Sequence, residues 1–494
     1  MILVLSGHTF KYETESLCKM FFSCQRFQIE YEAGDLSRDE MIFTRMKRGK
    51  THTLFYAFVR GKGRTCSKSI QVENPAAQEK NECERLLGLC VHGALSQFVG
   101  CSTKWGILTG IRPVKRIHEY WEQGKSDEEI KTVLERDYLV SPQKAELCLQ
   151  TARVQTPLLK CTQPKSFSLY ISIPYCPSRC SYCSFVSHSI TNRSALKLVP
   201  SYVEHLCREI AYTGKLAASL GLRLESVYWG GGTPTTLEPE QLAQILSAVE
   251  QNFDLSTLRE YTVEAGRPDT ITEEKLLVLK NAGVGRISIN PQTFQDAVLE
   301  EIGRRHTAQM AVEKYELARR VGFDCINMDL IAGLPKDSLE GFCRTVDQAV
   351  SLGPENITVH TLSVKRSSSL FQSDGLPQNL KDNPAGEMVD YAQNTLMNAG
   401  YAPYYLYRQK NTLENLENVG YAKPGTEGLY NVYIMEEVHT ILAVGASGVT
   451  KLVNPKNGLI DRVFNYKFPY EYIDHFDVMI DRKRKVAEFY EQQF

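Results

Sequence analysis

The stretch YISIPYCPSRCSYCSF, residues 170–185, contains three cysteines in the spacing C-x3-C-x2-C: Cys176, Cys180 and Cys183. Cysteine thiolates are the usual ligands of iron–sulfur clusters, and three on one loop can hold three irons of a [4Fe–4S] cube. No fourth cysteine follows, because position 185 is Phe185, so one iron keeps an open position. Structural zinc sites usually take four ligands from two paired knuckles, and no second C-x2-C occurs in the chain. The spacing therefore favours an iron–sulfur cluster over a zinc loop or buried thiols.

The bulk composition excludes several classes of protein. The chain has 494 residues, 43% hydrophobic and 23% charged, as in a globular protein of two or three domains. A net charge of −1 provides no field that would attract nucleic acid. No apolar stretch approaches the length of about 18 residues that would indicate a membrane span, and the apolar run at the N-terminus is too short for a signal peptide. The remaining cysteines show no pairing pattern. We therefore expect a cytoplasmic protein without a membrane span or a nucleic-acid partner.

The first third of the chain carries no motif that indicates chemistry. Alternating apolar residues in ILVLSG and THTLFYAFVRG predict strands, and helical periodicity predicts helices over residues 76–98 and within 126–154. The basic segment LTGIRPVK, residues 108–115, fits either a docking site for an anionic partner or a solvated helix start. Residues 156–166 are Pro- and Lys-rich, which indicates a linker. We expect residues 1–163 to form an accessory α+β domain.

From Ser166 onward, short apolar runs alternate with helical stretches. The predicted strands are residues 168–175, 226–229, 261–265, 286–290, 325–331 and 357–364. Near-continuous apolar strands that alternate with helices imply an α/β fold with a parallel sheet. Six such units are too few to close a (β/α)8 barrel of roughly 250 residues. We predict an open, partial (β/α)6 barrel over residues 164–400, and a cap over its mouth formed by residues 401–494.

Candidate ligand-binding residues fall at the carboxyl ends of these strands, where parallel α/β barrels gather their chemistry. The second strand runs into the sequence GGGTP, residues 230–234, whose glycines let the backbone approach a ligand closely. Glu264 ends the third strand, Gln292 follows the fourth and Asp329 lies on the fifth. Each residue alone is consistent with a polar surface position. On one rim together, they indicate a shared ligand with a cationic group and hydroxyls.

A C-x3-C-x2-C loop after a strand resembles the signature of the radical S-adenosylmethionine (SAM) superfamily. In that superfamily, the amino and carboxyl groups of SAM chelate the open iron. An electron from the cluster then splits a C–S bond of SAM to give a 5′-deoxyadenosyl radical. The resemblance implies two cofactors, a [4Fe–4S] cluster and SAM, and an electron donor such as flavodoxin or ferredoxin.

Further motifs narrow the resemblance. LYISIPYC, YWGGGTPT, RISINPQTF, IGRRHT and MDLIAGLP resemble the oxygen-independent coproporphyrinogen III oxidase (HemN-like) branch. LTGIRPVK, VHTLSVKR, PYYLYRQKN and the long N-terminal extension resemble the HemZ group within that branch. By position, the resemblance implies SAM contacts at Tyr170, Gly231, Gly232, Thr233, Glu264, Gln292, Arg304, Asp329 and Ser363.

The same resemblance implies a tetrapyrrole substrate. That branch converts two propionate side chains of coproporphyrinogen III into vinyl groups, which gives protoporphyrinogen IX. An apolar macrocycle with four carboxylates needs aromatic or aliphatic walls and a few cations at the rim. Such side chains follow the sixth strand and begin the predicted cap, where they fit either substrate contacts or a packed, solvated cap. They are Lys365, Arg366, Tyr405, Tyr407, Arg408 and Lys410.

Two departures from the branch pattern leave the substrate open. HemN-type oxidases continue to C-x3-C-x2-C-x-C, whereas this chain has Phe185 there, as the related haem chaperones of the HemW type do. Those chaperones carry H-N-x-x-Y-W with a histidine implicated in haem binding. The corresponding stretch here begins with Tyr430, although His439 follows closely. A haem-binding carrier and a radical SAM enzyme for another tetrapyrrole, such as haem, are therefore the alternatives.

Overall fold

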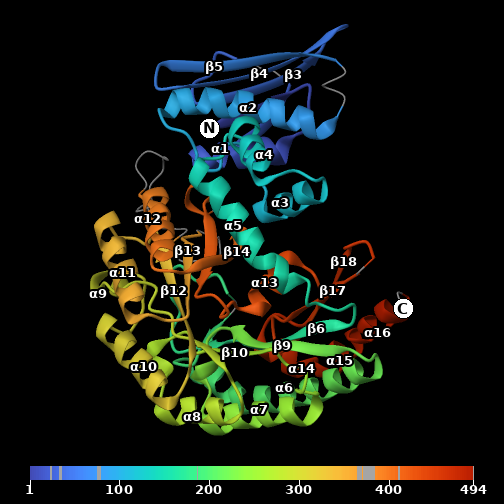
Figure 1. The fold of residues 1–494 in the computed structure, drawn as a ribbon, viewed down its shortest axis with the longest axis vertical. Helices are drawn as coiled ribbons and strands as arrows, with labels where there is room; N and C mark the ends of the chain where they lie inside the picture. The colour runs from blue at the N-terminus through green and yellow to red at the C-terminus, as the bar shows by residue number, and fades with distance from the viewer. Residues whose placement is uncertain are drawn as a thin grey trace.

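The chain folds around two β-sheets, a small one near the N-terminus and a large one that contains the cysteine loop (Figure 1). The computed structural model describes residues 1–22, 25–32, 36–74, 79–185, 187–363, 370, 384–409, 412–454 and 456–492. Within these ranges, no helix combines the length and the apolar character needed to cross a membrane.

The large sheet contains the six predicted parallel strands in sequence order. They are β6 (Ser166–Ile173), β9 (Arg223–Gly231), β10 (Glu260–Glu264), β11 (Arg286–Ser288), β12 (Cys325–Ala332) and β13 (Asn356–Thr361). The helices between them cover the outer face of the curved sheet (Figure 1). They are α6 (Arg193–Ser219), α7 (Pro239–Asn252), α8 (Glu273–Asn281), α9 (Asp296–Glu301), α10 (Ala308–Val321) and α11 (Leu339–Leu352). The predicted α/β fold with a partial parallel barrel is confirmed.

The barrel strands alternate between an apolar outer face and a polar inner face. On β6, Leu169 and Ile171 lie in the apolar core, whereas Tyr170 between them points to the other face, as the two-residue period of a strand requires. The inner residues of the neighbouring strands include Tyr228 and Glu264. The inner face of the barrel therefore surrounds polar side chains, while the outer face packs against the helices.

Residues 401–494 extend this sheet at both of its edges. At the β13 edge, β15 (Glu417–Ala422) and β14 (Ala402–Arg408) pair antiparallel. At the other edge, β16 (Thr440–Val444) pairs parallel with β6, and β17 (Val449–Val453) and β18 (Ile460–Phe464) follow antiparallel, which makes eleven strands. The helix α13 (Leu429–Glu436) connects the two edges along the chain. The division of the chain at residue 400 stays a prediction.

Three C-terminal helices pack beside the β6 edge, and a further helix precedes β14 (Figure 1). The first three are α14 (Pro469–Asp474), α15 (Phe476–Arg482) and α16 (Arg484–Glu491), and the fourth is α12 (Ala385–Asn398).

The small sheet has the strand order β2-β1-β3-β4-β5. Its strands are β1 (Ile2–Ser6), β2 (Gln28–Tyr31), β3 (Met41–Arg48), β4 (His52–Gly61) and β5 (Arg64–Glu73). The helices α1 (Lys11–Phe21) and α2 (Lys80–Val99) cover one face of this sheet (Figure 1). The strands predicted in ILVLSG and THTLFYAFVRG and the helix predicted over residues 76–98 are confirmed, the helix for its described part.

The helix α5 (Pro142–Leu159), preceded by α3 (Pro113–Glu122) and α4 (Asp127–Thr132), lies between the small sheet and the barrel (Figure 1). Its Lys144 is fully buried, with Nζ 2.6 Å from Glu417 Oε1 and 2.9 Å from Asp390 Oδ1. One apolar core runs continuously from the small sheet to α11 and α12. The linker predicted over residues 156–166 begins too early, because α5 continues through Pro157 to Leu159.

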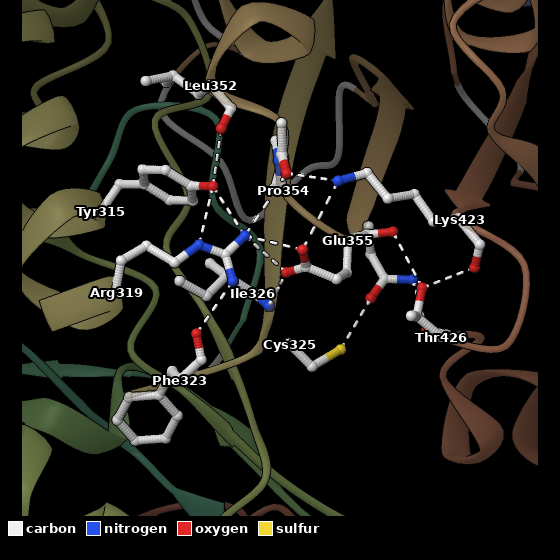
Figure 2. A network of polar contacts seen from close by, with 12 residues as sticks. Tyr315, Arg319, Phe323, Cys325, Ile326, Leu352, Pro354, Glu355, Lys423 and Thr426 are labelled. Carbon is white, nitrogen blue, oxygen red and sulfur yellow. Dashed lines mark hydrogen bonds and ion pairs between the residues drawn. The ribbon is translucent and has the colours of Figure 1, made fainter. Parts of the chain in front are cut away.

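Polar groups at the amino ends of β12 and β13 are paired with one another (Figure 2). Arg319 Nε donates to the Tyr315 hydroxyl at 3.0 Å, and Arg319 Nη2 forms an ion pair of 2.7 Å with Glu355. Glu355 also accepts from the Ile326 N–H at 3.0 Å and lies 3.6 Å from Lys423 Nζ. We call these five residues the foot network. It connects α10, β12 and the segment after β15 at the end of the barrel that is opposite the cysteine loop.

Candidate functional site

The cysteine loop leaves the carboxyl end of β6 and returns through a short parallel pair, β7 (Tyr175–Cys176) and β8 (His188–Ser189). The Cys183 N–H donates to the Cys180 carbonyl at 3.2 Å, which turns the loop back on itself. Burial raises the pKa of Cys183 to about 11, and the neighbouring Cys180 and Cys176 raise it as well. The fold therefore brings all three thiols together, in an environment where thiolates need a compensating cation.

The donor set fits a cluster better than a single ion. In the described part of the chain, no three Cys, His, Asp or Glu side chains converge to hold one metal ion. The cysteine ligands of a [4Fe–4S] cube each bind a different iron, so they need not converge on one point. Cys176, Cys180 and Cys183 are therefore the residues that would hold the cluster.

Two polar side chains are directed at the cysteine sulfurs. Arg267 Nη1 lies 3.4 Å from Cys180 Sγ, and Thr233 Oγ1 lies 3.6 Å from Cys176 Sγ. Donors at these positions stabilise the thiolate form that binds iron. Sequence reasoning missed Arg267. Its position in the sequence EAGRPD, directly after β10, is the signal that could have found it.

The glycine run packs tightly against the cysteine loop. The Gly232 N–H donates to the Ile173 carbonyl at 2.7 Å, and Gly231 has φ +102°. A Cβ atom on Gly232 would lie 2.5 Å from the Tyr175 carbonyl oxygen and 3.0 Å from Cys176 Sγ. A side chain at Gly232 would displace the first cysteine, so these glycines place the end of β9 beside the loop.

Three buried side-chain oxygens at the carboxyl end of β11 have no hydrogen-bond partner within the described part of the chain: Ser288 Oγ, Asn290 Oδ1 and Gln292 Oε1. They occupy alternate positions, while Ile287 and Ile289 on either side of Ser288 lie in the apolar core. A buried acceptor left without a donor costs about 1–3 kcal/mol. We call these three atoms the rim acceptors. They suit a ligand with amino and hydroxyl groups, as SAM has.

The backbone at Gln292 is constrained. Gln292 has φ +68°, a left-handed conformation that is uncommon outside glycine. Its N–H donates to the Asp329 carbonyl at 2.9 Å, and its carbonyl accepts from the Ile331 N–H at 3.0 Å. These bonds to β12 hold the Gln292 backbone in place, which is consistent with a ligand-positioning role.

Two carboxylates face the interior of the barrel. Glu264 Oε1 accepts from the Tyr228 hydroxyl at 2.6 Å. Burial raises the pKa of Glu264 to about 7, and the charge of Asp329 adds to this effect. Asp329 accepts from Asn327 Nδ2 at 2.7 Å and lies 3.8 Å from His360 Nε2. The carboxylates are therefore close enough to repel each other, and a cationic ligand between them would relieve the repulsion.

His360 is a second residue that sequence reasoning missed, although it lies in the motif VHTLSVKR. Burial opposes its charged form, but the neighbouring Asp329 carboxylate raises the pKa of His360 above its usual value.

Aromatic rings line the same interior. Tyr228 and Tyr430 are stacked with centroids 4.4 Å apart, and Tyr170 stacks on Tyr430 at 5.9 Å. On β14, Tyr405 and Tyr407 are stacked at 6.3 Å, and burial together with the charge of Asp329 raises the pKa of each. Tyr405 and Tyr407, two of the expected substrate residues, thus lie near the candidate SAM contacts.

Arg304 links the end of β11 to the cysteine loop. Its Nη1 donates to the Asn290 carbonyl at 2.8 Å, and its Nη2 donates to the hydroxyl of Tyr182, a loop residue, at 3.0 Å. Within the described residues, Arg304 Nε has no partner. This N–H is the group that could meet a SAM carboxylate. Ser363 pairs with Thr412 in a β-bridge just beyond β13.

Arg408, another expected substrate residue, lies away from this interior. Arg408 is 2% exposed, donates to the carbonyls of Leu108 and Asn415, and lies 4.9 Å from the Trp105 ring. Its guanidinium closes the junction with the N-terminal part of the chain, so it forms no part of the proposed substrate site. Lys365, Arg366 and Lys410 fall outside the described residues.

His439 is enclosed by the fold. It is 4% exposed, its Nε2 lies 2.7 Å from Ser168 Oγ, and its ring lies 4.2 Å from the Tyr433 ring. Burial lowers the pKa of His439 to about 3. A buried imidazole in these contacts is not available to bind haem without a local rearrangement.

An open parallel barrel with three cysteines on the loop after its first strand defines a radical SAM protein, and the radical SAM superfamily profile matches residues 170–349. The oxygen-independent coproporphyrinogen-III oxidase-like protein HemZ of Bacillus subtilis is 40% identical over 398 residues, which cover 80% of this chain and 79% of that protein. The chain therefore belongs to the radical SAM superfamily and, within it, to the HemZ family. The family implies a [4Fe–4S] cluster and SAM as cofactors.

One further sequence relative and one solved structure are also similar to this chain. The haem chaperone HemW of Bacillus subtilis is 32% identical over 313 residues, 61% of this chain and 77% of that protein. The solved structure of coproporphyrinogen III oxidase HemN from Escherichia coli aligns with a TM-score of 0.51 and 23% identity, covering 67% of this chain and 73% of that chain. The likeness to HemN shows a shared fold.

Proposed function

We propose that the protein is a radical SAM enzyme that oxidatively decarboxylates two propionate side chains of coproporphyrinogen III, without oxygen, to give protoporphyrinogen IX. The observation that carries the proposal is the position of the cysteine loop, on the same rim as a tyrosine-lined, carboxylate-containing interior. The name of the HemZ relative, an oxygen-independent coproporphyrinogen-III oxidase-like protein, supports the same substrate.

The reaction balances for each propionate. The side chain loses one hydrogen atom from its β-carbon, then CO2 and one electron, and a vinyl group remains. When bound, the cluster and SAM supply the hydrogen-atom abstraction. The electron that starts each cycle comes from a donor protein such as flavodoxin or ferredoxin, and the electron released by the substrate needs an acceptor.

The residues of the chain supply binding and orientation. Glu264, Asp329 and the rim acceptors accept hydrogen bonds from the amino and hydroxyl groups of SAM, and both carboxylates balance the charge of its sulfonium. Gly231, Gly232 and Thr233 keep the end of β9 close to the cluster. Tyr170 belongs to the same set by its position on β6.

The tyrosines would form the substrate wall. Tyr405, Tyr407 and Tyr430 present aromatic surface to an apolar macrocycle, and each carries a hydroxyl that can donate to a propionate oxygen. His360, 3.8 Å from Asp329 at the same site, adds a side chain that suits a carboxylate when it is protonated. Lys365, Arg366 and Lys410 belong to the proposal by their place in the sequence.

A haem carrier is the alternative function. The HemW relatives favour it, whereas the enclosure of His439 speaks against a haem ligand at that position. The alternative predicts a tight stoichiometric haem complex and no turnover of SAM.

One anaerobic assay separates these functions. Reconstituted protein is incubated with SAM, a chemical reductant and coproporphyrinogen III, and the products are measured by mass spectrometry. The proposal predicts 5′-deoxyadenosine together with a tetrapyrrole lighter by two CO2 and four hydrogen atoms. Deoxyadenosine without that product would move the assignment to another tetrapyrrole. Absence of both products, with stoichiometric haem binding, would favour the carrier.

A further inference from the structure

We propose that Arg267 sets the reduction potential of the cluster by donating a hydrogen bond to the sulfur of Cys180. This inference rests on the cysteine site of the proposed function and is independent of its substrate.

The guanidinium of Arg267 is fixed between a carboxylate and the cysteine loop. Its Nε and Nη2 donate to the two oxygens of Asp269 at 2.9 and 2.8 Å. This fork occupies one edge of the guanidinium and leaves Nη1 for the loop. Nη1 lies 3.4 Å from Cys180 Sγ and 3.5 Å from the Ser178 carbonyl oxygen.

The backbone around Arg267 is held as firmly as its side chain. Arg267 precedes a single 3-10 turn, Pro268–Thr270, and its carbonyl accepts from both the N–H and the hydroxyl of Thr270, at 2.9 and 2.8 Å. The side chain is 4% exposed. The Arg267 guanidinium holds the pKa of Asp269 below its usual value in spite of burial, so the pair stays ionised. A rigid support of this kind keeps Nη1 directed at the sulfur.

A purely structural role does not require this arrangement. Burying an ion pair costs several kcal/mol for desolvation, and a neutral amide could hold the Ser178 carbonyl equally well. The neighbouring Arg304 donates hydrogen bonds to a backbone carbonyl and to the Tyr182 hydroxyl. Arg267, in contrast, presents a charged donor to a cluster ligand.

The expected effect follows from charge. Reduction adds an electron to a cluster that three thiolates already make negative. Hydrogen bonds to the sulfurs and positive charge nearby stabilise the reduced form more than the oxidised form, which raises the reduction potential. Arg267 therefore makes the cluster easier to reduce by a donor protein.

Potentials of reconstituted full-length variants test the proposal, in the absence of SAM and substrate. The electron paramagnetic resonance signal of the reduced cluster is followed in a redox titration, with iron per chain as a loading check. Arg267→Gln should lower the ratio of reduced to oxidised cluster at a fixed potential about tenfold, which is about 59 mV for one electron. Asp269→Asn removes the opposing charge and should shift the ratio in the opposite direction. Arg305→Gln, an exposed neighbour of Arg304, should leave it unchanged.

The opposite signs separate electrostatics from loosening of the loop. If Arg267→Gln and Asp269→Asn shift the potential in the same direction, or if a fully loaded Arg267→Gln protein keeps the wild-type potential, the proposal is wrong. If Arg267→Gln does not fold or does not retain iron, the test rests on Asp269→Asn alone. A reduction potential of Asp269→Asn that equals or lies below the wild-type value then overturns the proposal. If the reduction potentials shift as predicted but the wild-type protein does not decarboxylate coproporphyrinogen III, this inference holds and the proposed substrate is wrong.

Discussion

The two ends of the barrel treat their buried polar groups differently. At the foot network, the Arg319 guanidinium, the Glu355 carboxylate and the Tyr315 hydroxyl bind one another and the backbone (Figure 2). At the opposite rim, Ser288, Asn290 and Gln292 each keep a buried oxygen without a partner in the described structure. The foot network shows that this fold can pair buried polar groups with one another. The difference indicates that the rim oxygens are reserved for a ligand, whereas the foot stabilises the fold.

We expect the largest loss of activity from a substitution in the cysteine loop, which lies at the rim of the barrel. Cys180→Ala removes the ligand of one iron, so we expect loss of the cluster and of 5′-deoxyadenosine formation to the detection limit. Cys207→Ala serves as the control, because Cys207 on α6 bonds to a helix carbonyl away from the loop. Iron and sulfide analysis checks both. A loaded and active Cys180→Ala protein would contradict the assignment of this cysteine.

Gly232 tests how closely the rim is packed. A Cβ atom there would meet a carbonyl oxygen at 2.5 Å and Cys176 Sγ at 3.0 Å, so Gly232→Ala should displace the first cysteine. We expect at least a tenfold loss of deoxyadenosine formation and reduced iron retention. Gly285→Ala is the control, because a Cβ atom there meets nothing within 4 Å. Equal activity of the two variants would show that the glycine run tolerates a side chain.

Glu264 gives the rim a pH dependence. Its pKa is about 7 in the folded protein against 4.5 as the ordinary value. The folded state therefore binds this proton more tightly than the unfolded state does. As pH rises from about 4.5 to about 7, this difference lowers the stability of the ligand-free protein by about 3 kcal/mol.

Thermal midpoints at pH 5 and pH 8 check this prediction. Glu264→Gln should lose less stability than the wild type across this interval, whereas Glu240→Gln, an exposed substitution on α7, should follow the wild type. Identical pH profiles for wild type and Glu264→Gln would mean that the carboxyl is not protonated in the empty site.

A substitution in the foot network should lower the stability of the fold and leave ligand binding unchanged. Glu355→Gln leaves Arg319 without its ion-pair partner, and hydrogen bonds to charged groups contribute about 1.5–3 kcal/mol. We expect a destabilisation of about 1–2 kcal/mol, since Arg319 and Lys423 are partly exposed to solvent. Denaturant unfolding measures it. An undisturbed free energy of unfolding would show that the network does not stabilise the fold.

The sequence predicted what depends on local pattern. Strand–helix alternation gave the six parallel strands, and the cysteine spacing located the loop. The pairing of β16 with β6 was not visible, because these strands are far apart in the chain. Arg267 and His360 were missed for a similar reason: their partners, Cys180 and Asp329, come from other strands or loops. Pro157 suggested a linker, yet α5 continues through it.

Equilibrium binding of SAM to the reconstituted protein tests the central claim most directly. Gln292→Leu removes a rim acceptor and should weaken SAM binding at least tenfold, with a free energy of unfolding at or above the wild-type value. Glu355→Gln, assayed well below its unfolding midpoint, should bind SAM as the wild type does. If Gln292→Leu binds SAM normally, or if both variants weaken binding equally, the rim oxygens are not reserved for SAM and the contrast between rim and foot does not hold.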